Sequence, residues 1–411
     1  MYFLLFIIYL AALTYLITRI TFIRKCGLPL QLIVALFLIK IFAGLAIGWI
    51  SEEFYPGNDY WGLNKDGLVE YKMLINDPAT FFSNILYSPY ENKYAGFFNA
   101  VGSYWNDLRD NIILKILGVC NLFSRGNYYI NSLFFNFFGF FGPVALFRVF
   151  SATFKNNYRP VLIGCFLLPS TLYFSSGIHK DLIVFTLIGL FFYALYFIAA
   201  GQASKKKWAL LLISLTGLFL MRNFVVIALI PALFAYLISS KKAWPAFPTF
   251  ISIYVLGFFL LFISQKILPS FQPLKLITQR QSDFNDLPVA ATQLPTIKLE
   301  PTIASLAKNA PQAFNHSLLR PYLWDSKSSY LIPIAIELII YQLLIFIVIL
   351  KYRTSLIINH PFIILGLFFA FSMIMLTGYI IPNTGSVVRY RSLYLPFLIT
   401  PFLYAIWPKL K

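Results

Sequence analysis

Two long apolar runs meet in the stretch Leu167-Leu-Pro-Ser-Thr-Leu-Tyr-Phe-Ser-Ser-Gly-Ile-His-Lys-Asp181. The second run begins with three ionisable side chains in succession, His179, Lys180 and Asp181. The start of a helix carries unpaired backbone N–H groups and a positive dipole end. These residue types at that place predict an anion-binding corner. The alternative is that the serines and Asp181 only cap the helix, while Lys180 extends to the lipid headgroups.

The composition is that of a polytopic membrane protein. Of 411 residues, 59% are hydrophobic and 12% are charged, and many apolar runs approach the roughly 20 residues that cross a bilayer. The predicted fold class is an all-α bundle of transmembrane helices, a single membrane domain over residues 1–411. Residues 1–20 lack a basic leading segment and a cleavage site, which predicts a retained span. The three cysteines lie far apart, so neither a disulfide framework nor a thiolate metal site is expected.

The placement of charge predicts a topology. The net charge is +18, but every second turn between apolar runs contains basic residues and none of the 15 acids. Cytoplasmic turns show this pattern, which therefore argues against nucleic acid as a partner. The N-terminus is predicted outside and the C-terminus inside, with the acids on the outer face. The acid-free turns hold Arg19, Arg24, Lys25, Arg148, Lys155, Arg159, Lys205, Lys206, Lys207, Lys241, Lys242, Lys351, Arg353, Lys409 and Lys411.

The apolar runs predict about eleven spans. Two long outer loops, 51–126 and 266–329, lie between them and lack the strand alternation of an independent domain. Amphipathic helices are expected in the first loop, one from Asp66 onward and one over 106–123 that fits the bilayer surface. The predicted spans are 1–19, 29–50, 127–147, 160–176, 181–200, 208–221, 224–240, 246–265, 330–350, 361–381 and 392–408.

Four short motifs stand at the outer ends of these spans. They are Pro-Ser-x-x-x-x-Ser-Ser-Gly-x-x-Lys-Asp at 169–181, an arginine after an apolar span (Arg222), Arg-Pro-Tyr-x-Trp-Asp at 320–325 before the span with Glu337, and Gly-x-x-x-Arg-Tyr-Arg at 385–391. With these motifs the sequence resembles bacterial envelope glycosyltransferases of the GT-C type and O-antigen or exopolysaccharide polymerases.

The resemblance implies a function in cell-envelope polysaccharide assembly. Such proteins take a sugar from a polyprenyl-phosphate-linked donor, pass it to a glycan acceptor, and place their catalytic groups on the outer face. The expected location is the bacterial inner membrane, in contact with the lipid bilayer, with a periplasmic active face. The short cytoplasmic turns leave no room for a nucleotide sugar, which also favours a lipid-linked donor.

Three outer carboxylates are candidates for the catalytic base, namely Asp59, Asp66 and Glu70. Displacing a phosphate from a sugar requires a carboxylate that takes the proton of the acceptor hydroxyl. Asp59 follows Gly57 and Asn58, and a turn there directs a carboxylate into a cleft. An Asx turn without a catalytic role is the alternative.

Five cations are candidates for binding the donor phosphate, because guanidinium groups fit phosphate oxygens bidentately. They are Lys180, Arg222, Arg320, Arg389 and Arg391. Each is alternatively an anchor to lipid headgroups. His179, Asp181 and Glu337 are the predicted supporting residues, and for Glu337 the alternative is a carboxylate that reaches the interface.

No cofactor is evident from the sequence. The three histidines lie far apart, and no metal site is predicted, although the carboxylates leave a divalent cation such as Mg²⁺ possible. Signatures of a serine nucleophile and of a glycine-rich phosphate loop are absent from the sequence.

A transporter or flippase for an anionic or lipid-linked substrate is the alternative function. Such proteins show interrupted helices and charges near the middle of the membrane. Lys40 is the only charge near the middle of a predicted span, and the sequence shows no internal repeat. A non-catalytic component of envelope assembly is a third possibility.

Overall fold

The structure, a computed structural model, describes residues 1–55, 57–86, 103–155, 157–242, 244–267, 272–288, 290, 292–325, 331–351 and 359–407. In these ranges every regular element is a helix, and β-pairing is limited to one isolated bridge between Gln293 and Asn383. The all-α prediction is confirmed. The chain divides into two compact units, one of residues 1–155 and 165–222 and one of residues 156–164 and 223–411.

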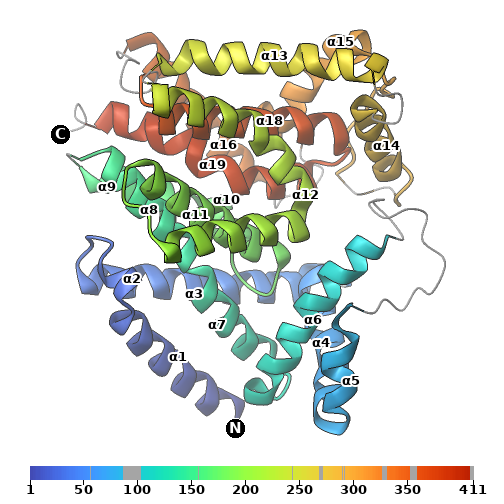
Figure 1. The fold of residues 1–411 in the computed structure, drawn as a ribbon. Coiled ribbons are helices and arrows are strands. Elements are labelled where there is room, and N and C mark those ends of the chain that lie inside the picture. The colour runs from blue at the N-terminus through green and yellow to red at the C-terminus, as the bar shows by residue number, and fades with distance from the viewer. Residues whose placement is uncertain are drawn as a thin grey trace. The chain divides into compact units, whose positions relative to one another are not determined.

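The first unit holds the charged residues of the site described below, and its helices are shown in Figure 1. Its helices are α1 (Tyr2–Arg19), α2 (Thr21–Arg24), α3 (Leu30–Phe54), α4 (Asp59–Asn76), α5 (Pro78–Ser83), η1 (Asn84–Leu86), α6 (Tyr104–Ser124), α7 (Tyr128–Gly139), α8 (Phe141–Thr153), α10 (Pro169–Phe174) and α11 (Lys180–Ala199).

The second unit holds the C-terminal half of the chain. Its helices are α13 (Ala246–Ile267), α14 (Pro273–Asn285), α15 (Ile303–Phe314), η2 (Asn315–Leu319), α16 (Leu331–Lys351), α18 (Pro361–Ile380) and α19 (Thr384–Ile406). Two further helices, α9 (Tyr158–Phe166) and α12 (Lys205–Lys242), contribute residues to both units.

Seven helical stretches of the described residues are long and apolar enough to cross a membrane. The chain is therefore a multi-pass membrane protein by the length and composition of its helices. The stretches are Tyr2–Arg19, Leu30–Phe54, Tyr128–Thr153, Lys180–Ala199, Lys205–Lys241, Leu331–Lys351 and Pro361–Ile380.

Two of the predicted spans, 208–221 and 224–240, fall within the single helix α12. Arg222 interrupts this helix with non-helical torsion angles, φ −154° and ψ 82°. The sequence thus predicted an interruption of the apolar run at Arg222. In the structure this interruption is a local break inside one helix, not a turn between two helices.

The predicted span 160–176 is not one continuous helix. It consists of α9 and α10, separated at residues 167–168. Leu168 has extended torsion angles, φ −66° and ψ 117°, because the ring of Pro169 disfavours helical geometry in the preceding residue. Pro169 then occupies the first turn of α10, where its missing N–H needs no partner.

The final helix starts earlier than predicted. The sequence predicts a span from 392, with Arg389 and Arg391 in the preceding turn. In the structure α19 begins at Thr384, because the Asn383 side chain caps it by accepting a hydrogen bond of 2.7 Å from the Ser386 N–H. Both arginines therefore lie inside the helix.

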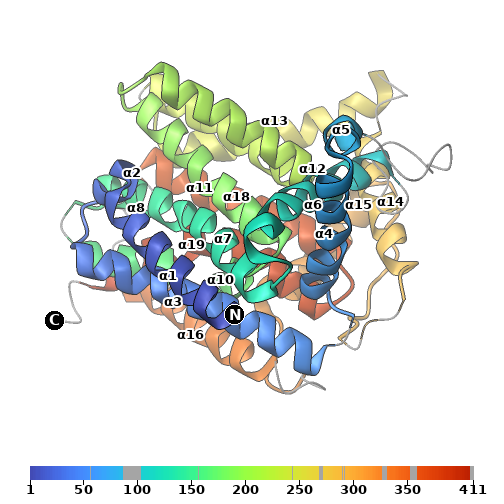
Figure 2. The same cartoon turned by 90° about the horizontal axis from the view of Figure 1, so that it is seen from below.

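The helices of the first long loop pack on the membrane helix α7. Figures 1 and 2 show α4 and α6 side by side. The Asn131 amide on α7 donates to Asn64 Oδ1 on α4 at 2.8 Å and to Asn121 Oδ1 on α6 at 2.7 Å, and all three residues are buried. Because buried polar groups are costly unless paired, this amide network fixes α4 and α6 against α7. Asp59 is thereby held at a defined place at the start of α4.

Candidate active site

The turn 175–179 carries the central residue of the site, His179. This residue is the N-cap of α11, and its Nδ1 atom accepts a hydrogen bond of 3.2 Å from the Asp181 N–H. The capping role that the sequence suggested for the serines and Asp181 therefore belongs to His179. The His179 side chain is fully buried and packs against the ring of Tyr60 from α4, with 4.7 Å between the ring centroids and an angle of 32° between the ring planes.

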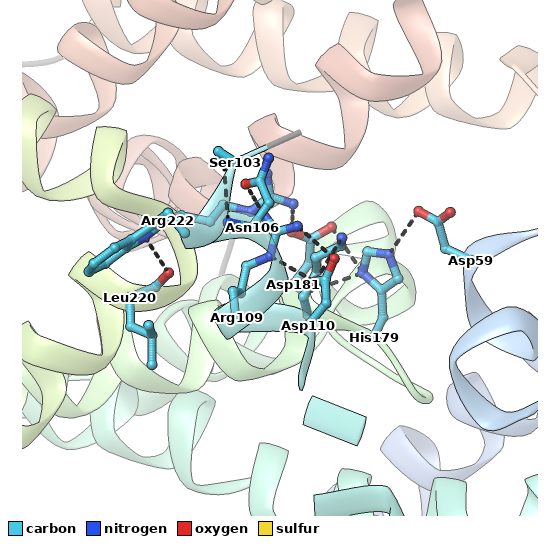
Figure 3. Close-up of polar contacts among 11 residues, drawn as sticks. Asp59, Ser103, Asn106, Arg109, Asp110, His179, Asp181, Leu220 and Arg222 are labelled. Atoms are coloured by element: carbon cyan, nitrogen blue, oxygen red, sulfur yellow. Dashed lines mark hydrogen bonds and ion pairs between the residues drawn. The ribbon is translucent and has the colours of Figure 1, made fainter. Parts of the chain in front are cut away.

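Two carboxylates flank the His179 ring (Figure 3). Asp59 Oδ2 lies 3.7 Å from Nε2, and Asp181 Oδ2 lies 3.1 Å from Nδ1. Nδ1 accepts the backbone N–H only when it is unprotonated and donates to Asp181 only when it is protonated. The ring therefore makes only one of these two Nδ1 contacts at a time, depending on which nitrogen carries a proton, and its Nε2 atom lies on the side of Asp59.

Asp181 also forms a buried ion pair with Arg222. Asp181 Oδ1 lies 2.5 Å from Arg222 Nη2, and the side-chain exposed fractions are 0% and 7%. A backbone carbonyl just before the break at Arg222 has a partner outside the helix, because the Trp105 indole N–H donates to Leu220 O at 3.0 Å (Figure 3). A tryptophan from α6 thus stabilises the helix break that places Arg222.

A second charged group, from α6, lies beside the first. Arg109 donates to both carboxylate oxygens of Asp110, at 2.8 and 2.9 Å, and to Asn106 Oδ1 at 3.2 Å. Lys180 Nζ lies 3.7 Å from Asp110 Oδ1. Burial opposes ionisation of Asp110, but the hydrogen bonds from Arg109 and the charge of Lys180 outweigh it and lower the pKa of this carboxyl. Asp110 is therefore a carboxylate at neutral pH.

Sequence reasoning missed Arg109 and Asp110. The signal was present as polar residues at 106, 109 and 110, which share one face at the start of a helix predicted to be amphipathic. The interpretation of 106–123 as a helix along the bilayer surface considered only its apolar side. The structure shows that the polar side completes the charged cluster.

The charged cluster of the first unit is composed of Asp59, Arg109, Asp110, His179, Lys180, Asp181 and Arg222. It contains three carboxylates, Asp59, Asp110 and Asp181, and three lysine or arginine side chains. Asp59 is the most exposed member, with 58% of its side chain exposed, whereas His179 and Asp181 are fully buried. An exposed base with a buried proton acceptor behind it is suited to removing a proton from a bound hydroxyl group.

The other predicted bases lie elsewhere on α4. Asp66 is exposed, and Glu70 forms an ion pair of 2.5 Å with Lys115 of α6. Lys115 also donates to Asn84 Oδ1 at 2.5 Å. With a rise of about 1.5 Å per residue, Glu70 lies about 16 Å along the helix from Asp59. The structure therefore brings only Asp59 to the charged cluster, and Glu70 joins α4 to α6.

Three of the predicted phosphate ligands belong to the second unit. Arg391 is buried and donates to the carbonyls of Ser317, at 3.3 Å, and Arg320, at 2.7 Å. Arg320 pairs with Asp325 at 3.6 Å, and Arg389 is partly exposed on α19. Arg391 thus fixes the irregular segment that follows α15. The convergence of Arg389 and Arg391 with Lys180 and Arg222 on the donor phosphate stays a prediction.

Glu337 lies on α16 and accepts a hydrogen bond of 2.7 Å from the Tyr341 hydroxyl group one turn later. His316 lies in η2, four residues before Arg320, and is buried. Burial lowers the pKa of His316, and the charge of Arg320 lowers it further.

Among the described residues of the chain, no group of three or more His, Cys, Asp and Glu side chains is arranged to hold a metal ion.

Comparisons with known proteins give no relative. No protein-family model, no curated protein and no solved structure matches this chain. The charged cluster and the apolar helices are therefore the features that bear on function.

Proposed function

We propose that the protein is a membrane enzyme that transfers or polymerises sugars from a polyprenyl-phosphate-linked donor during assembly of a cell-envelope polysaccharide. One observation carries the proposal, namely the exposed Asp59 carboxylate next to the buried His179, which contacts Asp181, which in turn pairs with Arg222. The motifs that resemble envelope glycosyltransferases and polymerases support it, because one of them, 169–181, has Lys180 and Asp181 of the charged cluster at fixed positions.

In the proposed reaction Asp59 takes the proton of the acceptor hydroxyl group. The acceptor oxygen then forms a bond with the anomeric carbon of the donor sugar, and the bond from that carbon to the phosphate oxygen breaks. His179 lies behind Asp59 and stabilises the transferred proton, while Asp181, held by Arg222, orients the imidazole. The proton finally leaves to water, and the phosphate departs with the lipid.

Cations near Asp59 stabilise the departing phosphate in this proposal. Lys180 and Arg109 each have 18% of their side chain exposed and are the accessible cations of the charged cluster. Arg222 is buried with its guanidinium group against Asp181, and it contributes positive electrostatic potential without contacting the phosphate. Charge-assisted hydrogen bonds of this kind stabilise the charge that develops on a leaving group.

The proposed topology has about eleven spans, an outer N-terminus and an inner C-terminus in the bacterial inner membrane. The acid-free turns support this orientation. The 37-residue apolar stretch Lys205–Lys241 supports a division of α12 into two spans, because about 55 Å of helix exceeds the roughly 30 Å of the hydrocarbon core. The charged cluster then faces the periplasm.

Reconstitution tests the proposal. The purified protein in vesicles, supplied with a lipid-linked oligosaccharide, should lengthen the glycan or move it to an acceptor, as gel electrophoresis or mass spectrometry of the lipid extract would show. Absence of any glycan product across a panel of polyprenyl-linked donors, from protein that is folded in the membrane, would contradict the proposed reaction.

Transport of an anionic or lipid-linked substrate is the second candidate function. Two features of the structure favour it, because transporter sites are built from interrupted helices and intramembrane charges. α12 is interrupted at Arg222, and Lys40 is buried within α3. Movement of a labelled lipid-linked sugar between leaflets without covalent change would support this function instead of transfer.

A further inference from the structure

A buried ammonium group lies inside the first unit, on the apolar helix α3. The Lys40 side chain is only 2% exposed, and its Nζ atom donates to the Ser175 backbone carbonyl at 2.5 Å. Nζ also lies 3.3 Å from Ser175 Oγ and 3.3 Å from Ser176 Oγ. These three oxygen atoms match the three N–H donors of an ammonium group.

The charge of Lys40 has no acidic partner in the described part of the chain. None of the ion pairs found there includes Lys40. Removing an ammonium group from water is expensive, and charges in membrane helices pair with carboxylates or with backbone carbonyls. Among the described residues, the charge of Lys40 is therefore stabilised by hydrogen bonds to the three oxygens of Ser175 and Ser176.

The oxygens belong to the end of α10. Ser175 is the C-cap of that helix, and the carbonyls at a helix end carry partial negative charge. The Ser176 hydroxyl group donates to Leu172 O at 2.6 Å, so its lone pairs are directed to the ammonium group. Backbone and hydroxyl oxygens at a helix end are the ligands by which membrane proteins bind monovalent cations.

We propose that Ser175 O, Ser175 Oγ and Ser176 Oγ form a cation site that selects a primary ammonium ion, and that the Lys40 side chain is its tethered occupant. The site holds the first residues of the turn 175–179, whose last residue is His179. Gly177 lies between them at φ +76°, a conformation that L residues rarely adopt. The proposal does not depend on the reaction that the protein catalyses.

Truncation of Lys40 tests the site with a free ligand. Lys40→Ala removes three carbons and the amine, the atoms of n-propylammonium. A cavity of about 10 Å³ already lies beside Lys40, Thr171 and Ser175, which is about the space of one water molecule, and truncation enlarges it. The probe is n-propylamine, whose neutral form crosses apolar regions. Its addition to purified Lys40→Ala should raise Tm saturably, by about 2–4 °C.

Two controls separate the cation site from general effects of the amine. Lys40→Met fills the same space without a charge, and neither it nor the native protein should respond to n-propylamine. n-Propanol, which lacks the charge, should leave the Tm of Lys40→Ala unchanged. Equal responses of Lys40→Ala and Lys40→Met, or no response of Lys40→Ala, would overturn the proposal.

A second pair of variants applies if Lys40→Ala does not fold. Ser176→Ala removes one oxygen of the site in the otherwise native chain and should lower Tm by about 2–4 °C. Ser214→Ala is the matched control, because Ser214 is a fully buried serine whose hydroxyl group has no hydrogen-bond partner among the described residues. Equal Tm values for Ser176→Ala and Ser214→Ala would also overturn the proposal.

Discussion

Asp181→Asn should strongly destabilise the first unit, because it leaves the Arg222 guanidinium group buried without its carboxylate partner. Asp181 is fully buried and Arg222 is 7% exposed, with 2.5 Å between Oδ1 and Nη2. Charge centres about 4 Å apart interact by about 4 kcal/mol at an effective dielectric constant near 20. Breaking a buried pair from one side costs about 3–5 kcal/mol of unfolding free energy.

A double-mutant cycle separates this interaction from the effect of each residue alone. Arg222→Met should destabilise the protein by a similar amount, since it leaves Asp181 buried and ionised. The double variant Asp181→Leu with Arg222→Met should lose much less than the sum, because no unpaired charge remains. We expect a coupling of at least about 2 kcal/mol.

The assay is denaturant unfolding of the purified protein in mixed micelles, followed by tryptophan fluorescence. Asp66→Asn is the control, because Asp66 is exposed on α4, and surface substitutions change the unfolding free energy by about 0.5 kcal/mol or less. Additive single and double effects, or an Asp181→Asn variant as stable as the native protein, would refute the buried ion pair.

Three further predictions concern the membrane topology, the pH dependence of stability and the second unit. Reporter fusions after Lys207 and Lys242 should report cytoplasm and fusions near Gln281 periplasm, and the reverse at Gln281 would overturn the orientation. The pKa of Asp110 is lower in the folded protein than in the unfolded chain. The Asp110 carboxylate therefore stabilises the fold fully above the ordinary aspartate pKa, and this stabilisation is lost as the pH falls through the pKa of the folded protein. Asp110→Asn should therefore make Tm depend less on pH on the acid side. Arg391→Lys should lower Tm more than Arg389→Lys, because one lysine cannot reproduce the two carbonyl contacts of a buried guanidinium group.

Several features of the fold could be read from the sequence because they depend on local composition. The apolar runs predicted an all-α chain with several helices long and apolar enough to cross a membrane, and the structure has such helices. Lys180 and Arg222 were predicted from charge beside apolar runs, and Asp59 from the turn at Gly57 and Asn58. The first and last residues of a helix could not be predicted where a single capping side chain determines them. The Asn383 cap starts α19 eight residues before the predicted span, and the polar residues of its first turns hid that start from a hydropathy pattern.

The contacts of Lys40 and several contacts of the charged cluster could not be predicted, because they join residues that are distant in the chain. Lys40 was noted as a charge in a span, but its partners at 175–176 are 135 and 136 positions away. The pairing of Asp181 with Arg222 depends on the break in α12, which a tryptophan from α6 stabilises. Only the packing of α3, α6 and α11 in three dimensions shows these contacts.

The most direct test of the account compares Asp59→Asn with Asp66→Asn in glycan synthesis. Both variants replace a carboxylate of α4 by its amide, but only Asp59 faces His179. Asp59→Asn should abolish glycan product, with at least a 100-fold loss of rate as expected for removal of a general base, while membrane abundance stays normal. Asp66→Asn should retain native synthesis. Native product from Asp59→Asn would contradict the assignment of Asp59 as the base.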